Sequence, residues 1–185
     1  MDGVTGFEFP SGSLFLGIVP DTDPASRIYR LAKVLKSARK FRGGVTEQNR
    51  LHITLFFLGD GRCLSGRIGR LLFAAVAEVR MQPFEVSFDR TASFRGRAGN
   101  HPFVLLGDNG TSRLKSFRGT LGAAMTRHSL NRWSNTDFNP HITLLYDACK
   151  VEEQPIEPIS WTVSEFVLIH SMDGHKPLAR WPLRG

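Results

Sequence analysis

LHITL at residues 51–55 and PHITL at residues 140–144 share the tetrad His-Ile-Thr-Leu. Only six histidines occur among 185 residues, so the same three residues after two of them indicate an internal duplication rather than chance. Each copy ends a polar stretch and begins an apolar one, which is typical of a loop that leads into a buried strand. The repeat therefore predicts two related lobes, each in one half of the chain and each with its own copy of the tetrad.

Side chains of a β-strand alternate between its two faces, so every second residue of the tetrad points the same way. The isoleucine and leucine of each copy are expected in a core, and the histidine and threonine on the opposite face. If the two lobes face each other, their shared cleft is lined by four side chains: His52, Thr54, His141 and Thr143.

Two histidines and two hydroxyls across a cleft suit displacement at phosphorus. The nucleophile and the leaving oxygen lie roughly in line there, so a base acts on one side and an acid on the other. With an ordinary pKa of about 6.5, histidine can do either job near neutral pH. Threonine hydroxyls can donate hydrogen bonds to the phosphoryl oxygens, on which charge builds in the transition state.

Two plainer interpretations of the tetrad stay open from the residues alone. A single strand histidine usually has a structural role, although its duplication beside threonine favours chemistry. Histidine is also a common metal ligand, but no carboxylate or cysteine lies at ligand spacing near either copy. Asp60 and Asp147 follow the two apolar stretches and are expected to close turns. We therefore expect no metal and no cofactor.

The rest of the sequence alternates predicted strands and helices. Strands are expected at residues 13–19, 51–58, 84–88, 102–107, 140–146 and 161–169, with 178–185 as a short edge strand. Helices are expected from Asp23-Pro24 for about four turns, from Ser65 to before Pro83, and after Asn109-Gly110. Connections are expected at residues 41–50, 95–101, 129–139 and 152–158. This mixed order, with a hairpin at 84–107, predicts an α+β fold in one bilobal domain over residues 1–185.

The composition indicates a basic protein. Lys+Arg outnumber Asp+Glu by 24 to 17, for a net charge of +7, which favours a polyanionic partner such as nucleic acid or a nucleotide. Cys63 and Cys149 stand apart from each other and from any metal-binding spacing. The first residues lack the apolar run of a signal peptide, and no stretch has the apolar length of a membrane span. A reduced, cytoplasmic protein outside the membrane is expected.

The two His-x-Thr motifs, at 52–55 and 141–144, resemble those of the 2H phosphoesterase superfamily. The blocks LHITLFFLGD and PHITLLYDA are most similar to those of bacterial and archaeal RNA 2',3'-cyclic phosphodiesterases, also called 2'-5' RNA ligases. The opening SLFLGIVP and residues 161–185 resemble the family's first and closing strands, so the resemblance covers most of the chain. It implies two pseudo-symmetric antiparallel sheets flanked by helices around a central cleft.

The resemblance also implies an activity and a role for each motif residue. The expected reaction opens the 2',3'-cyclic phosphate at an RNA end to a 2'-phosphate, with reversible, ATP-independent 2'-5' joining. By position in the motifs, His52 is the proton donor to the departing 3' oxygen, and His141 is the proton acceptor that activates water. Thr54 and Thr143 hold the phosphoryl group. No obligate protein partner is implied, and a monomer is expected.

One position departs from the family pattern. Many relatives carry arginine three residues after the second threonine, where this chain has Tyr146. Tyrosine can bind substrate through one hydrogen bond or by stacking on a base, but it offers no bidentate cation to a phosphate. Four arginines are candidates for a compensating charge: Arg95, Arg97, Arg118 and Arg127.

Several other residues are given plainer roles. The remaining histidines are expected to be structural or exposed: His101, His128, His170 and His175. Three phenylalanines are candidates for stacking on bases, although core packing is their commoner role: Phe56, Phe57 and Phe94.

Two rival functions use the same features. A phosphodiesterase for a small cyclic phosphate, or for 2'-5' oligonucleotides, would need the same residues. A non-catalytic RNA-binding module would keep the cleft and the charge but would not need both motifs. Turnover of a mononucleotide compared with an RNA oligomer, and its dependence on salt, separates these functions.

Overall fold

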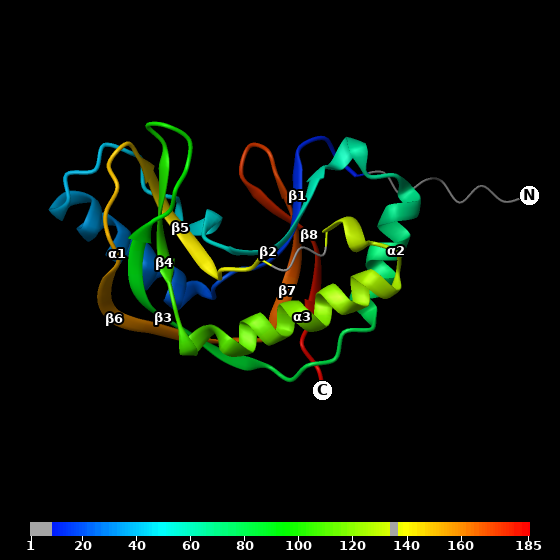
Figure 1. Ribbon diagram of the computed structural model, residues 1–185. Coiled ribbons are helices and arrows are strands. Elements are labelled where there is room, and N and C mark those ends of the chain that lie inside the picture. Colours follow the sequence, from blue (N-terminus) through cyan, green and yellow to red (C-terminus); the bar gives the residue numbers. More distant parts are fainter. Residues whose placement is uncertain (1–8, 134–136) are drawn as a thin grey trace, which may run out of the picture.

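A computed structural model describes residues 9–133 and 137–185, and its strands form two four-stranded antiparallel sheets (Figure 1). Sheet A has the order β2-β1-β7-β8, with β1 at Ser13–Ile18, β2 at Ile53–Asp60, β7 at Glu165–Ser171 and β8 at His175–Pro182. Sheet B has the order β5-β4-β3-β6, with β3 at Phe84–Ser93, β4 at His101–Leu106, β5 at His141–Asp147 and β6 at Gln154–Val163. The predicted α+β class with two antiparallel sheets is confirmed.

The duplication is visible as two strand–helix–strand units. The first is β1, α1 (Thr22–Ala38) and β2, and the second is β4, α3 (Ser112–Arg127) and β5. In each unit the two strands pair antiparallel, and the strand that bears the tetrad lies at the outer edge of its sheet. The two tetrad strands therefore occupy equivalent places, and they approach each other in the middle of the molecule (Figure 1).

The helices of the two units do not stay with the sheet of their own strands. From α1, the guanidinium of Arg27 donates to Pro158 O of β6 at 3.3 Å, so this helix packs on sheet B. From α3, Phe117 contacts Phe166 of β7 with ring centroids 5.2 Å apart and Phe84 of β3 with ring centroids 5.7 Å apart, so this helix packs on both sheets. The last two strands, β7 and β8, also return to sheet A. The expectation that each lobe comes from one half of the chain is therefore wrong, because the chain crosses over and one apolar core joins both sheets.

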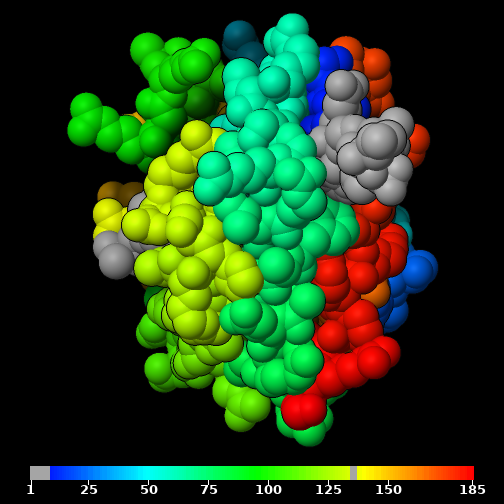
Figure 2. Space-filling view, turned by 90° about the vertical axis from the view of Figure 1, so that its right-hand side faces the viewer, coloured from blue at the N-terminus to red at the C-terminus, as the bar shows by residue number. Residues whose placement is uncertain are grey.

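Sheet A is covered by two neighbouring helices. Figure 2 looks onto α2 (Gly66–Ala77) and α3, which lie side by side on this face, with β8 next to α2. Phe73 of α2 packs against Trp181 of β8 with ring centroids 5.4 Å apart. None of the helices in the described ranges combines the length and the apolarity that a bilayer crossing requires.

Two adjoining strands replace the single strand that was predicted at 161–169. The chain leaves sheet B after Val163 and enters sheet A at Glu165. The strand in sheet B, β6, begins at Gln154, inside the stretch that its prolines suggested was a connection. Proline lacks a ladder donor but is tolerated on an edge strand, and β6 is the edge of sheet B. That tolerance explains why Pro155 and Pro158 misled the prediction.

The predicted helix starts are correct at one helix and displaced at another. Ser65 caps α2, because its hydroxyl accepts a hydrogen bond from the Ile68 amide at 3.4 Å. Helix α1 begins at Thr22, with Asp21 as its N-cap, so Asp23 and Pro24 lie inside the first turn. Proline is accepted there because first-turn amides have no acceptor within the helix. Short 3-10 helices lie at Gln48–Arg50 (η1), Gly61–Cys63 (η2), Asn109–Thr111 (η3) and Asn131–Trp133 (η4).

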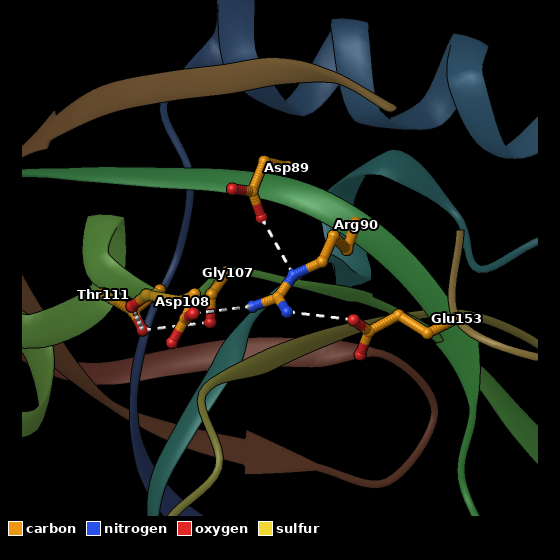
Figure 3. Close-up of polar contacts among 6 residues, drawn as sticks. All are labelled: Asp89, Arg90, Gly107, Asp108, Thr111 and Glu153. Atoms are coloured by element: carbon orange, nitrogen blue, oxygen red, sulfur yellow. Dashed lines mark hydrogen bonds and ion pairs between the residues drawn. The ribbon is translucent and has the colours of Figure 1, made fainter. Parts of the chain in front are cut away.

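A small ion-pair network fastens one end of sheet B (Figure 3). The guanidinium of Arg90 on β3 lies 3.2 Å from Asp89, 3.8 Å from Asp108 and 2.9 Å from Glu153. Asp108 follows β4, and its carbonyl accepts the Thr111 hydroxyl at 2.9 Å. A single exposed ion pair stabilises little, but a shared arginine ties three chain segments together.

Candidate active site

One pocket of about 550 Å³ contains all five site residues that the sequence predicts. It is lined by Gly44, Val45, Thr46, Glu47, Arg50, His52, Thr54, His141, Thr143, Tyr146 and His175. The first tetrad contributes His52 and Thr54, and the second contributes His141 and Thr143. The structure therefore brings together two pairs of residues that are far apart in the sequence.

The predicted alternation of the tetrads is confirmed. Ile53, Leu55, Ile142 and Leu144 are fully or almost fully buried in the core. The intervening histidines and threonines keep part of their surface exposed. Burial of the apolar pair in each strand thus holds the polar pair toward the pocket.

The two imidazoles are held in the same way. His52 Nδ1 lies 2.8 Å from Arg50 O, and His141 Nδ1 lies 2.8 Å from Asn139 O. A carbonyl only accepts, so each Nδ1 carries a proton and Nε2 is left for chemistry. When an imidazole is neutral, its Nε2 accepts a proton, and when it is charged, the same atom donates one. The duplicated geometry therefore supplies two equivalent acid–base groups.

The surroundings of His52 are aromatic and crowded. Its ring centroid lies 4.7 Å from that of Phe15 and 4.6 Å from that of His175. The rings of Phe15 and His175 are 5.4 Å apart, so the three rings form one cluster. Phe15 belongs to a small apolar patch with Val167 and Ile169 of β7, beneath this wall of the pocket.

Burial and nearby charge favour the neutral forms of two histidines in this pocket. Burial lowers the pKa of His52, the charges of His141 and Arg50 lower it further, and the bond to Arg50 O opposes them. Burial, then the charges of His52 and Arg50, lower the pKa of His175 to about 4. His175 is thus uncharged at neutral pH, and an anion bound near His52 would raise the pKa of His52 again.

The surroundings of His141 are more open. Phe94, just after β3, meets the His141 ring edge-on with centroids 5.0 Å apart. Of the other aromatic candidates for stacking, Phe56 is buried and Phe57 is 59% exposed on the outside of β2. Phe94 is therefore the aromatic candidate that contacts a tetrad histidine.

Arg50 supplies the positive charge of the pocket, and sequence reasoning missed it. Among residues 9–133 and 137–185, it is the one lysine or arginine that lines this pocket. The four arginines proposed from sequence do not line this pocket. Arg95 and Arg97 are exposed in the β3–β4 loop, and Arg127 pairs with Glu78. Arg118 donates to Leu55 O and lines an adjoining hollow that also contains Thr54 and His141. The only sequence signal for Arg50 was its position two residues before His52.

Tyr146 is held at the pocket by a loop from the first unit. The carboxylate of Asp147, next to it, accepts the amides of Arg42 at 2.6 Å and Gly43 at 2.8 Å. A Cβ on Gly43 would lie 1.7 Å from Tyr146 O, so only glycine permits this approach. Val45 forms an isolated bridge with Leu145 of β5. The wall formed by residues 44–47 is thus fixed to the second tetrad strand.

The remaining histidines divide into two groups. His101 Nδ1 accepts the Gly96 amide, His128 Nε2 contacts Glu78, and His170 Nε2 contacts Ser11 O, so these three are structural as expected. His175 is a correction, because it lines the pocket. The β7–β8 hairpin brings it beside His52, and no local sequence pattern records that long-range contact.

Asp60 and Asp147 close turns, as the sequence predicts. Asp60 accepts the Arg62 amide at 2.9 Å, and Asp147 accepts the Cys149 amide at 2.9 Å. In the part of the chain that the structure describes, no group of three or more His, Cys, Asp or Glu side chains is arranged to hold a metal ion.

Two pseudo-symmetric sheets with a His-x-Thr pair on each wall of one pocket are the arrangement of a 2H phosphoesterase. The chain belongs to the 2'-5' RNA ligase superfamily, whose family model matches residues 20–175. This membership supports an enzyme with phosphoesterase or 2'-5' ligase activity.

Solved structures have the same fold over nearly the whole chain. E. coli LigT complexed with 3'-AMP is 24% identical, with a TM-score of 0.69 and coverage of 96% of this chain and 100% of that one. LigT in its apo form is 26% identical, with a TM-score of 0.68 and coverage of 96% and 100%. TT0787 of Thermus thermophilus is 21% identical, with a TM-score of 0.67 and coverage of 94% and 98%. No curated protein matches the chain.

Proposed function

We propose that the protein is a metal-independent RNA 2',3'-cyclic phosphodiesterase that leaves a 2'-phosphate. The observation that carries the proposal is the matched pair of imidazoles, each with Nδ1 fixed by a backbone carbonyl, in one pocket with two threonines. LigT has been crystallised with 3'-AMP and with NADP+, which supports a nucleotide end as the ligand of this pocket. We place the enzyme in the cytoplasm.

In the proposed reaction, His141 Nε2 takes a proton from water as the water oxygen attacks phosphorus. The bond from phosphorus to the 3' oxygen breaks, and His52 donates its proton to that oxygen. The products are a 3'-hydroxyl and a 2'-phosphate, and proton exchange with solvent resets the two rings. If a 5'-hydroxyl of a second RNA replaces water, the same steps form a 2'-5' bond. Such displacement is mainly a matter of positioning and charge stabilisation.

The other pocket residues stabilise the phosphoryl oxygens. Thr54 and Thr143 donate their hydroxyls, and Arg50 provides the cation that Tyr146 does not. A bound anion also offsets the charge of Arg50 at His52, which raises the pKa of His52 toward the protonated form that donates. Tyr146, 49% exposed, is free to meet the base or the ribose.

The test is incubation with RNA that ends in a 2',3'-cyclic phosphate, in excess chelator, followed by mapping of the product ends. We expect hydrolysis to 2'-phosphate ends that persists in chelator and is lost in His52→Ala and in His141→Ala. Loss of turnover in chelator, or 3'-phosphate products, would contradict the proposal. Binding of RNA without turnover would favour a non-catalytic RNA-binding module.

A further inference from the structure

A second hollow, of about 560 Å³, adjoins the active-site pocket. It is lined by Tyr29, Lys33, Lys36, Ser37, Lys40, Phe41 and Val45, and we call it the lysine groove. Val45 lines both hollows, so the groove begins where the wall of the active-site pocket ends. Most of its residues come from the second half of α1 and from the turn after that helix.

The charge of the lysine groove is not neutralised by the protein. None of the described residues that line it is acidic. The two arginines of α1 and its C-cap, Arg39, bond to neutral acceptors: Arg27 to Pro158 O, Arg30 to Ser26 O and Arg39 to Gln154 Oε1. Within the two described ranges, no carboxylate lies within ion-pair distance of Lys33, Lys36 or Lys40 either. Lys33 lies over the ring of Tyr29, 5.5 Å from its centroid.

Lys40 occupies a backbone position that lysine rarely takes. Its φ is 56°, in the left-handed region, just after the end of α1. The Phe41 amide bonds to Lys36 O at 3.0 Å, which closes the helix end in the way that usually employs glycine. Ser129 takes the same conformation after α3, so left-handed closure is common to both helix ends, and at Lys40 it fixes a cation beside the groove.

We propose that the lysine groove binds the phosphodiester backbone of the RNA strand that leads to the cyclic phosphate. This inference rests on the proposed function and adds that the preferred substrate is an oligomer rather than a mononucleotide. Single-stranded nucleic acid is bound by basic grooves that follow its backbone, and the groove offers three lysines with no acidic residue in its lining. From Lys33 to Ala38 the helix rises about 7 Å, and Lys40 follows its end, so the three cations can meet about two to three phosphates.

The experiment compares uridine 2',3'-cyclic phosphate with an eight-nucleotide RNA that ends in the same group. The variant is Lys33→Gln/Lys36→Gln/Lys40→Gln. The matched control is Arg67→Gln/Arg70→Gln/Lys115→Gln, which removes the same charge from exposed positions on α2 and α3. For the wild type we expect a KM about 10-fold or more lower for the RNA than for the mononucleotide.

The groove variant is expected to lose that preference while its kcat, and its kcat/KM for the mononucleotide, stay within about twofold of wild type. The salt slope of RNA binding should decrease by about 2, because each phosphate contact contributes about 0.7 on a single strand. The control variant is expected to keep the preference. An unchanged preference in the groove variant, or an equal loss in the control, would overturn the inference.

Lys40→Gly separates binding from folding, because it removes the cation and relieves the backbone. We expect RNA affinity to decrease while the unfolding midpoint does not fall. Fluorescence anisotropy with a 2'-phosphate-ended RNA measures affinity without turnover. If neither substrate is hydrolysed, the proposed function fails, whereas weaker RNA binding in the groove variant still supports the groove. If the mononucleotide is hydrolysed but the wild type and the groove variant bind RNA equally, the groove inference alone fails.

Discussion

The strand that bears His52 and the strand that bears His141 have the same tetrad, the same edge position and the same Nδ1–carbonyl bond, but different surroundings. His52 packs in a three-ring cluster with Phe15 and His175, next to Arg50. His141 meets one ring, that of Phe94. Duplication has thus preserved the geometry of the two imidazoles, while the neighbours have diverged and give them unequal electrostatics.

The largest effect should follow from removing either imidazole. We expect His52→Ala and His141→Ala each to lower kcat by about 10²–10⁴-fold, because each removes one proton transfer from the transition state. The double variant should be little slower than either single one, since the two act as a unit. His101→Ala, outside the pocket, is the control and should keep activity. If one tetrad histidine proved dispensable, the equivalence of the two strands would not extend to catalysis.

The two walls of the pocket differ in charge, because Arg50 lies on the His52 side and Tyr146 on the His141 side. Removing the cation from one side and adding one to the other tests this difference. We expect Arg50→Gln to lower kcat/KM by about 10–100-fold, the effect of losing a charge-assisted hydrogen bond. Adding Tyr146→Arg to that variant places a cation on the other wall and should recover part of the loss. Arg50→Gln should also raise the pKa of His52 and of His175, because the charge of Arg50 lowers both. A variant with normal turnover would show that Arg50 does not contact the phosphate.

A smaller effect is the pH dependence of stability that His175, beside His52, should cause. The pKa of His175 is lowered to about 4 in the folded protein, whereas it is about 6.5 in the unfolded chain. The unfolded state therefore binds more protons between these values, and stability falls as the pH falls from about 6.5 to about 4. The free energy of unfolding should therefore decrease less on acidification in His175→Phe than in the wild type. After allowance for screening of this half-buried ring, we expect the difference between the two decreases to be about 1–2 kcal/mol. Urea unfolding of the wild type and of His175→Phe at pH 7 and pH 4.5 measures this difference. If both proteins lost the same free energy of unfolding, the lowered pKa of His175 would be contradicted.

The smallest effect compares the ends of the two duplicated helices. Lys40 follows α1 with φ 56°, and Ser129 follows α3 with φ 60°. Replacing either by glycine should raise the free energy of unfolding by up to about 1 kcal/mol, because relief of left-handed strain exceeds the added chain entropy. Only Lys40→Gly should weaken RNA binding. If Lys40→Gly and Ser129→Gly changed RNA affinity equally, Lys40 would have no specific role in RNA binding.

The sequence predicts the parts of the molecule that are encoded locally. Strand alternation and the repeated tetrad locate His52, Thr54, His141 and Thr143, and the cap at Ser65 is correct. The packing of α1 on sheet B and of α3 across both sheets could not be read from the sequence, because amphipathic helices do not specify which sheet they cover. His175 was missed for a related reason, since only the pairing of β7 with β8 brings it to the pocket.

The proposed mechanism requires the imidazoles of His52 and His141 to contact the same phosphate. Titration of the ¹⁵N-labelled protein with uridine 2'-monophosphate, with the histidine ring nitrogens observed by NMR, tests it directly. We expect the Nε2 signals of His52 and His141 to shift together with a single Kd, while that of His101 does not shift. Movement of only one of the two, or movement with two different Kd values, would contradict it.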